Sequence, residues 1–148
     1  MKTSVLLFSL LYLPNLIKAQ DPVNWNYTAK KISDKTFEVH ISAAIQKGWH
    51  LYSQAQPGDA VAIPTRIIFK KHPLAKFNGK IKEVGKLEKY KEPSLGIEQW
   101  QYSDQVDFVQ TVILKSDAKT ILSGTIEYQT CTDKKCLPPQ IIKFNVSL

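Results

Sequence analysis

Apolar residues in this 148-residue chain recur at every second position, and this spacing constrains the fold more than any other feature. The clearest run places one set of apolar side chains on a single face: Phe37, Val39, Ile41, Ala43 and Ile45. Alternation of this kind is typical of a half-buried strand, because successive side chains of a strand point to opposite faces. No long stretch keeps its apolar residues at helical spacing without a Gly or Pro inside it. We therefore predict an all-β chain.

Further short runs with strand-like composition follow the same pattern, at residues 25–31, 49–53, 66–70, 106–114, 125–130 and 142–148. Turn-forming clusters such as residues 33–35 and 56–59 lie between them. About seven short strands with regular turns predict an immunoglobulin-like β-sandwich. Trp25, Trp49 and Trp100 are interpreted as core residues of that sandwich.

One segment, residues 86–101, departs from this pattern, since it is rich in charge and contains Pro93 and Gly96. We interpret it as a long loop, and loops of that length in compact domains are often functional.

The amino terminus has the layout of a secretory signal peptide. Lys2 precedes an apolar run from Val5 to Leu13, and the small residue Ala19 precedes Gln20. The apolar run is too short to span a bilayer, and later apolar runs are interrupted by polar residues. We predict that residues 1–19 are a signal peptide and that residues 20–148 form one domain without a transmembrane segment. The protein is expected to be periplasmic or secreted.

The charge of the chain gives little support to nucleic-acid binding. Two of the 20 basic residues, Lys2 and Lys18, lie in the signal segment, which leaves 18 basic against 13 acidic residues. The lysines are scattered along the chain, which is typical of a solvated surface and not of a basic binding site. No nucleic-acid partner is expected.

Cys131 and Cys136 lie between the last two strand-like runs, close enough in sequence to pair with each other. An exported protein is expected to hold such a pair oxidised at least part of the time. One interpretation is a static structural bridge. It would close a loop of about six residues and so stabilise the fold by only about 2 kcal/mol, and a domain of this size can fold without it. The other interpretation, which we favour, is a bridge that opens and closes in thiol:disulfide exchange.

The residues around the pair are compatible with redox chemistry. Lys134 and Lys135 favour the thiolate, the nucleophilic form of cysteine, although Asp133 partly offsets them. The alternatives are a binding or adaptor module with a static disulfide and a secreted metal-binding protein.

A metal site is disfavoured by the sequence. His40, His50 and His72 do not lie at zinc-site spacing from the cysteines. The single methionine is Met1, which argues against a copper(I) site. We expect neither a metal nor another cofactor.

Three blocks of the sequence resemble a known family: residues 48–54 (Gly-Trp-His-Leu-Tyr-Ser-Gln), Pro64-Thr65 leading into residues 67–69, and residues 128–139, which contain Tyr-Gln-Thr-Cys and Cys-Leu-Pro-Pro. They are similar to the amino-terminal periplasmic domain of the thiol:disulfide interchange protein DsbD. The similarity extends from about Trp25 to Leu148.

This resemblance implies an immunoglobulin-like fold and a role as a protein-disulfide reductase component. Members pass electrons from a membrane-embedded relay to thioredoxin-like proteins, some of them in cytochrome c biogenesis. The resemblance implies that Cys136 forms mixed disulfides with partners and that Cys131 resolves them. It also implies that His50 and Tyr52 lie beside the cysteines.

The resemblance further implies a cap that covers the cysteine pair and lifts on docking. Alignment on Gly96 places the cap at Glu92, Pro93, Ser94, Leu95 and Gly96. Leu95 is the apolar residue at a place where the family usually has a phenylalanine or tyrosine. Full-length members continue into a membrane domain and a thioredoxin-like domain, so we expect a separate membrane protein to supply electrons to this chain, which is expected to be a monomer.

Overall fold

The computed structural model describes residues 21–148, so the predicted signal peptide lies outside the described residues. The described chain contains these strands: β1 (Val23–Ser33), β2 (Thr36–Ile45), β3 (His50–Tyr52), β4 (Arg66–Phe69), β5 (Ala75–Gly85), β6 (Glu88–Lys91), β7 (Glu98–Tyr102), β8 (Gln105–Leu114), β9 (Ile121–Tyr128), β10 (Thr130–Cys131) and β11 (Gln140–Ser147). Within residues 21–148, no helix has the length and apolar character needed to cross a membrane. The all-β prediction is confirmed.

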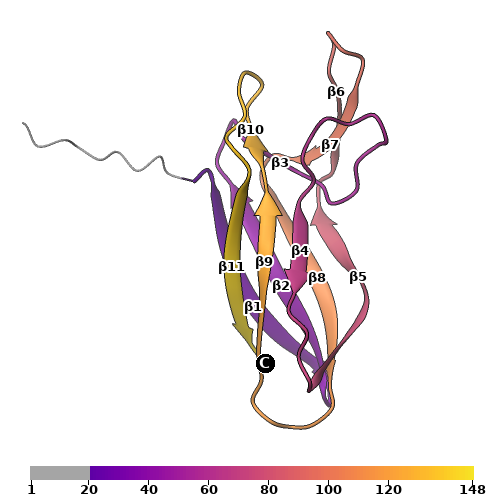
Figure 1. Cartoon of the computed structure of the whole chain (residues 1–148), viewed down its shortest axis with the longest axis vertical. Coiled ribbons are helices and arrows are strands. Elements are labelled where there is room, and N and C mark those ends of the chain that lie inside the picture. Colours follow the sequence, from indigo (N-terminus) through magenta and orange to yellow (C-terminus); the bar gives the residue numbers. More distant parts are fainter. Residues whose placement is uncertain (1–20) are drawn as a thin grey trace, which may run out of the picture.

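Two antiparallel sheets pack face to face and enclose the core (Figure 1). One has the strand order β1-β2-β8-β5, and the other has the order β11-β9-β4. The alternating residues of each sheet supply the core: Val39, Ile41, Phe108 and Val112 from the first, and Leu122, Ile126, Phe144 and Val146 from the second. Burial of each such side chain stabilises the fold by about 1.5–3 kcal/mol. The result is the predicted sandwich.

A third sheet, with the order β10-β3-β7-β6, lies at one end of the sandwich and is called the end sheet below (Figure 1). Two of its strands continue directly into sandwich strands. Only residues 103 and 104 separate β7 from β8, and only Gln129 separates β9 from β10. The end sheet is therefore held by the same chain segments that form the core.

The seven runs that the alternation predicted as strands all coincide with strands of the structure. The interpretation of residues 86–101 as a long loop was wrong, because β6 and β7 pair there as a hairpin from Glu88↔Gln101 to Lys91↔Glu98. Strand β6 is mostly solvent-exposed and tolerates charged side chains, so it lacks the apolar alternation that marks a buried strand. Only the turn between the two strands is irregular.

The sequence also missed β5. Its partly buried positions include Glu83 as well as Phe77 and Ile81, and three exposed residues, 78–80, separate Phe77 from Ile81, so the apolar alternation is interrupted. A bulge between Asn78 and Lys82 interrupts the pairing with β8 as well.

The tryptophan prediction was correct for two residues of three. Trp25 and Trp49 pack against the core. Trp100 does not belong to the core cluster. Its indole nitrogen donates to Glu98, and Lys89 Nζ lies 4.8 Å from its ring centre.

Candidate functional site

Cys131 and Cys136 form a disulfide that closes a short hairpin, residues 130–137, called the disulfide hairpin below. Two backbone hydrogen bonds flank the bridge. Thr132 N donates to Lys135 O on the turn side, and Leu137 N donates to Thr130 O on the other side. The cysteines thus occupy the intervening non-hydrogen-bonded pair, where facing side chains approach most closely. The predicted position, in the connection between the last two long strands, is confirmed.

The turn of the disulfide hairpin is organised by Thr132. Its hydroxyl oxygen accepts hydrogen bonds from Lys134 N and Lys135 N. The Lys135 ammonium lies 5.8 Å from the ring centre of Trp49, within cation–π range. These contacts hold the turn without a helix, so neither sulfur receives the dipole of a helix amino terminus.

The two cysteines differ in their access to solvent. Cys131, the last residue of β10, is 1% exposed and pairs with His50 of β3. Cys136 is exposed on the outer arm of the hairpin. A protein partner can therefore reach Cys136 directly, whereas Cys131 lies behind it.

A groove of about 320 Å³ runs along the disulfide and is called the disulfide groove below. Residues 131–136 form one wall. The rest of its lining comes from β3 and from the β6–β7 hairpin: His50, Tyr52, Tyr90, Glu92, Gln99 and Gln101. Two predicted site residues, His50 and Tyr52, thus lie beside the cysteines.

His50 is the register partner of Cys131, so the two side chains project from the same face of adjacent strands. The imidazole is 8% exposed, and its Nε2 lies 3.4 Å from the Tyr52 hydroxyl. Burial lowers the pKa of His50, although the carboxylates of Asp133 and Glu88 oppose the shift. Burial also raises the pKa of Tyr52. At neutral pH the groove therefore presents a neutral imidazole and a protonated phenol.

The predicted cap residues form the turn of the β6–β7 hairpin. Glu92 N donates to Ile97 O, Gly96 N donates to Glu92 O, and Gly96 has a φ of 68°. Glu92 lines the disulfide groove, but Leu95 is 66% exposed and lies outside its lining. The aromatic side chain that this hairpin contributes to the groove is Tyr90.

Sequence reasoning missed Tyr90, Gln99 and Gln101 as groove residues. The spacing of two between Glu88, Tyr90 and Glu92 was the available signal, because it places all three on one face of a strand. Gln101 is buried, and its side-chain oxygen has no hydrogen-bond partner among residues 21–148.

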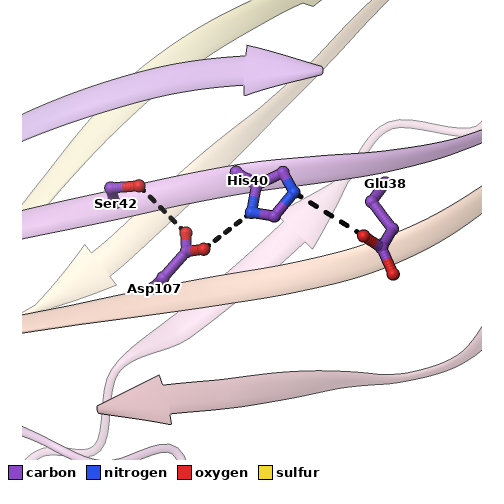
Figure 2. Close-up of polar contacts among 4 residues, drawn as sticks. All are labelled: Glu38, His40, Ser42 and Asp107. Carbon is purple, nitrogen blue, oxygen red and sulfur yellow. Dashed lines mark hydrogen bonds and ion pairs between the residues drawn. The ribbon is translucent and has the colours of Figure 1, made fainter. Parts of the chain in front are cut away.

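A second polar cluster lies on the paired strands β2 and β8, on the face of the sheet that points away from the core (Figure 2). Asp107 accepts hydrogen bonds from His40 Nδ1 at 2.6 Å and from the Ser42 hydroxyl at 2.9 Å, and Glu38 lies 3.8 Å from His40 Nε2. Within residues 21–148, no group of three or more His, Cys, Asp or Glu side chains is arranged to hold a metal. The cluster ties β2 to β8 across the sheet.

A family model described as "Thiol:disulfide interchange protein DsbD, N-terminal" matches residues 18–148. No curated protein sequence matches the chain.

Several solved structures are similar to this chain. The N-terminal periplasmic domain of ScsB from Proteus mirabilis aligns with a TM-score of 0.52 and 14% identity, over 85% of this chain and 44% of that one. The yeast GGA1 GAE domain aligns with a TM-score of 0.50 and 10% identity, over 89% and 96% of the two chains. The DsbD N-terminal domain of Neisseria meningitidis in the reduced form aligns with a TM-score of 0.42 and 15% identity, over 85% of each chain. The chain spans less than half the length of the ScsB structure.

Proposed function

The chain belongs to the family of DsbD amino-terminal domains, and we propose that it is an exported thiol:disulfide exchange domain that relays reducing equivalents through Cys131 and Cys136. The observation that carries the proposal is the unequal exposure of the two sulfurs on one short hairpin. Exchange proceeds through one mixed disulfide at a time, so one sulfur must be presented and the other retained.

In the reduced domain, the Cys136 thiolate attacks a disulfide of the partner. The partner disulfide breaks, a bond forms between Cys136 and one partner sulfur, and the second partner sulfur leaves as a thiolate. Cys131 then attacks the Cys136 sulfur, which forms the intramolecular bridge and releases the first partner sulfur. Two electrons pass to the partner, and this domain is oxidised. The burial of Cys131 behind Cys136 supports this order.

The partners that we propose are thioredoxin-like proteins on the delivering side and a membrane-embedded protein on the supplying side. A solved complex from Neisseria meningitidis pairs a DsbD N-terminal domain with a PilB N-terminal domain, with a TM-score of 0.49 to this chain. We propose further that residues 1–19 are a signal peptide and that residues 20–148 form a domain in the periplasm.

We propose that the β6–β7 hairpin shields the disulfide. The turn 92–96 carries the predicted cap residues, and Tyr90 and Glu92 line the disulfide groove. Tyr90 fits the aromatic role of the cap better than Leu95 does, because Leu95 faces solvent.

Trapping of the mixed disulfide tests the proposed roles. The probe is a thioredoxin-like protein that retains only its attacking cysteine, activated as a mixed disulfide with an aromatic thiol. Reduced Cys131→Ser is expected to accumulate a stable covalent complex with this probe, because no resolving thiol remains. Cys136→Ser is expected to trap little or none, since Cys131 is buried.

Non-reducing electrophoresis and intact mass measure the complex, and the double serine variant is the control. The opposite pattern would reverse the two roles. Negligible trapping by both single variants would favour a static bridge in a binding module.

A further inference from the structure

Resolution of the mixed disulfide requires Cys131 to lose a proton, and this requirement rests on the proposed function. A thiol attacks a disulfide only as the thiolate. Cys131 is 1% exposed, so bulk water has almost no access to its sulfur. Burial also disfavours the charged form of a thiol. A group inside the protein is therefore needed to take the proton.

The disulfide groove contains one side chain of the right kind. Imidazole is the only side chain whose ordinary titration falls between pH 5 and 8, and His50 is the only histidine that lines this groove. His50 faces Cys131 as its register partner in the adjacent strand. Directly opposed residues lie about 4.5–5.5 Å apart at Cβ, so the imidazole and the Cys131 sulfur are neighbours across the strand pair.

We propose that His50 is the proton-transfer residue of the exchange reaction: it accepts the proton of the Cys131 thiol during resolution and delivers it to the partner thiolate that leaves. The S–H bond of Cys131 breaks as the Cys131–Cys136 bond forms. The mixed disulfide breaks in the same step, and its electron pair stays on the partner sulfur. The proton then passes from His50 to that sulfur, so atoms and charge balance.

The surroundings of His50 suit both halves of this role. The Tyr52 hydroxyl lies 3.4 Å from Nε2, and the two rings pack edge to face with centres 5.4 Å apart, which fixes the orientation of the imidazole. Burial lowers the pKa of His50, so the ring is neutral and able to accept a proton at pH 7.

The charged groups around the ring come from the neighbouring elements. Asp133 of the disulfide hairpin and Glu88 of β6 favour the imidazolium, which limits the cost of holding the proton briefly. The other charged residues of the groove are Glu92 of the cap turn and Lys134 and Lys135 of the disulfide hairpin. Once protonated, the buried imidazolium gives up its proton readily, because burial disfavours its charge.

A two-phase reaction isolates the step. The reduced domain is mixed with one equivalent of an aromatic disulfide whose released thiolate is coloured. The first release reports attack by Cys136, and the second, a first-order phase, reports resolution by Cys131. The aromatic thiolate leaves without needing a proton, so the second phase measures the base function of His50 alone.

We expect His50→Gln to slow the second phase by about 100-fold at pH 7, the low end of the usual range for general-base catalysis, and to leave the first phase unchanged. In the unmodified domain, the second phase should hold its rate from pH 8 to pH 7 and fall only as His50 becomes protonated at lower pH. In His50→Gln, the rate should instead rise about tenfold per pH unit with the ionisation of Cys131 itself.

Two further variants complete the test. His50→Tyr keeps an aromatic ring against Tyr52 but has no group that titrates near neutrality, so it should behave as His50→Gln does while preserving the melting temperature. His72→Gln changes a histidine outside the groove and should match the unmodified domain.

Equal second phases and equal pH profiles in all variants would overturn the role of His50 and leave the proposed function standing. Absence of any coloured release from the unmodified domain would overturn both.

Discussion

The carboxylate of Glu83 accepts three hydrogen bonds at the junction of the sandwich and the end sheet. Ser53 Oγ and the Tyr102 hydroxyl donate to one oxygen at 2.7 and 2.8 Å, and Gln54 N donates to the other at 2.6 Å. Burial and the hydrogen bond to Glu83 raise the pKa of Tyr102. Its hydroxyl therefore stays protonated and remains a donor at physiological pH. Glu83 in β5 thus fixes the ends of β3 and β7, the strands beside the cysteines.

We expect Glu83→Gln to lower the free energy of unfolding by about 1.5–3 kcal/mol, the usual contribution of hydrogen bonds to a charged group. The glutamine side chain replaces one acceptor oxygen with an NH2 group. This group is itself a donor, so it cannot accept the hydrogen bonds that the carboxylate oxygen accepts. Denaturant unfolding measures the change. Glu127→Gln is the matched control, since its surface ion pair with Arg66 at 3.7 Å should contribute less than about 1 kcal/mol. Equal small losses in both variants would contradict the role of Glu83.

At the scale of elements, the sequence predicted strands wherever burial on one face is reflected in alternation. The β2 run from Phe37 to Ile45 is such a case, because four of its alternating residues, Val39, Ile41, Ala43 and Ile45, belong to the core. Strand β6 is mostly exposed and lacks this alternation, and β5 is interrupted by a bulge around Gly79.

The site was predictable only in part for the same reason. The cysteine pair is local in sequence, and the family resemblance placed His50 and Tyr52 beside it. The opposite wall depends on which strands pair in the end sheet. The β3–β7 pairing joins residues far apart in the chain, Leu51 and Tyr102 among them, and no local pattern specifies it. The β6–β7 hairpin is local, but β6 is mostly exposed and lacks apolar alternation. Tyr90 and Gln101 were therefore missed.

The hairpin itself offers a test of shielding. We expect Tyr90→Ala to raise the rate of attack by a small thiol on the oxidised domain several-fold, because it removes an aromatic side chain from the disulfide groove. Leu95→Ala in the same hairpin should change the rate little, since Leu95 is outside the groove lining. Both side chains are solvent-exposed, so both variants should unfold within about 0.5 kcal/mol of the unmodified domain. If only Leu95→Ala reacted faster, Leu95 and not Tyr90 would be the shielding residue, as the sequence predicted.

At the scale of the whole molecule, stability and reactivity lie in different parts of the fold. The large buried side chains of the core cluster come mainly from the two sandwich sheets, and the disulfide lies in the end sheet beyond them (Figure 1). A bridge between residues five apart constrains little of the unfolded chain. The fold can therefore open and close this bond repeatedly without loosening the core.

We expect reduction of the disulfide to lower the melting temperature by about 10 °C or less, because closing so short a loop contributes only about 2 kcal/mol. Hydrogen exchange should show the loss of protection confined to β10 and the disulfide hairpin, while amides of β2, β8 and β9 keep the slow exchange of a packed core. The double variant Cys131→Ser, Cys136→Ser should match the reduced domain on both measurements, since both lack the same bond. A reduced domain that loses protection across the sandwich, or a double variant that fails to fold, would mean that the bridge is a structural element and that the exchange function is untenable.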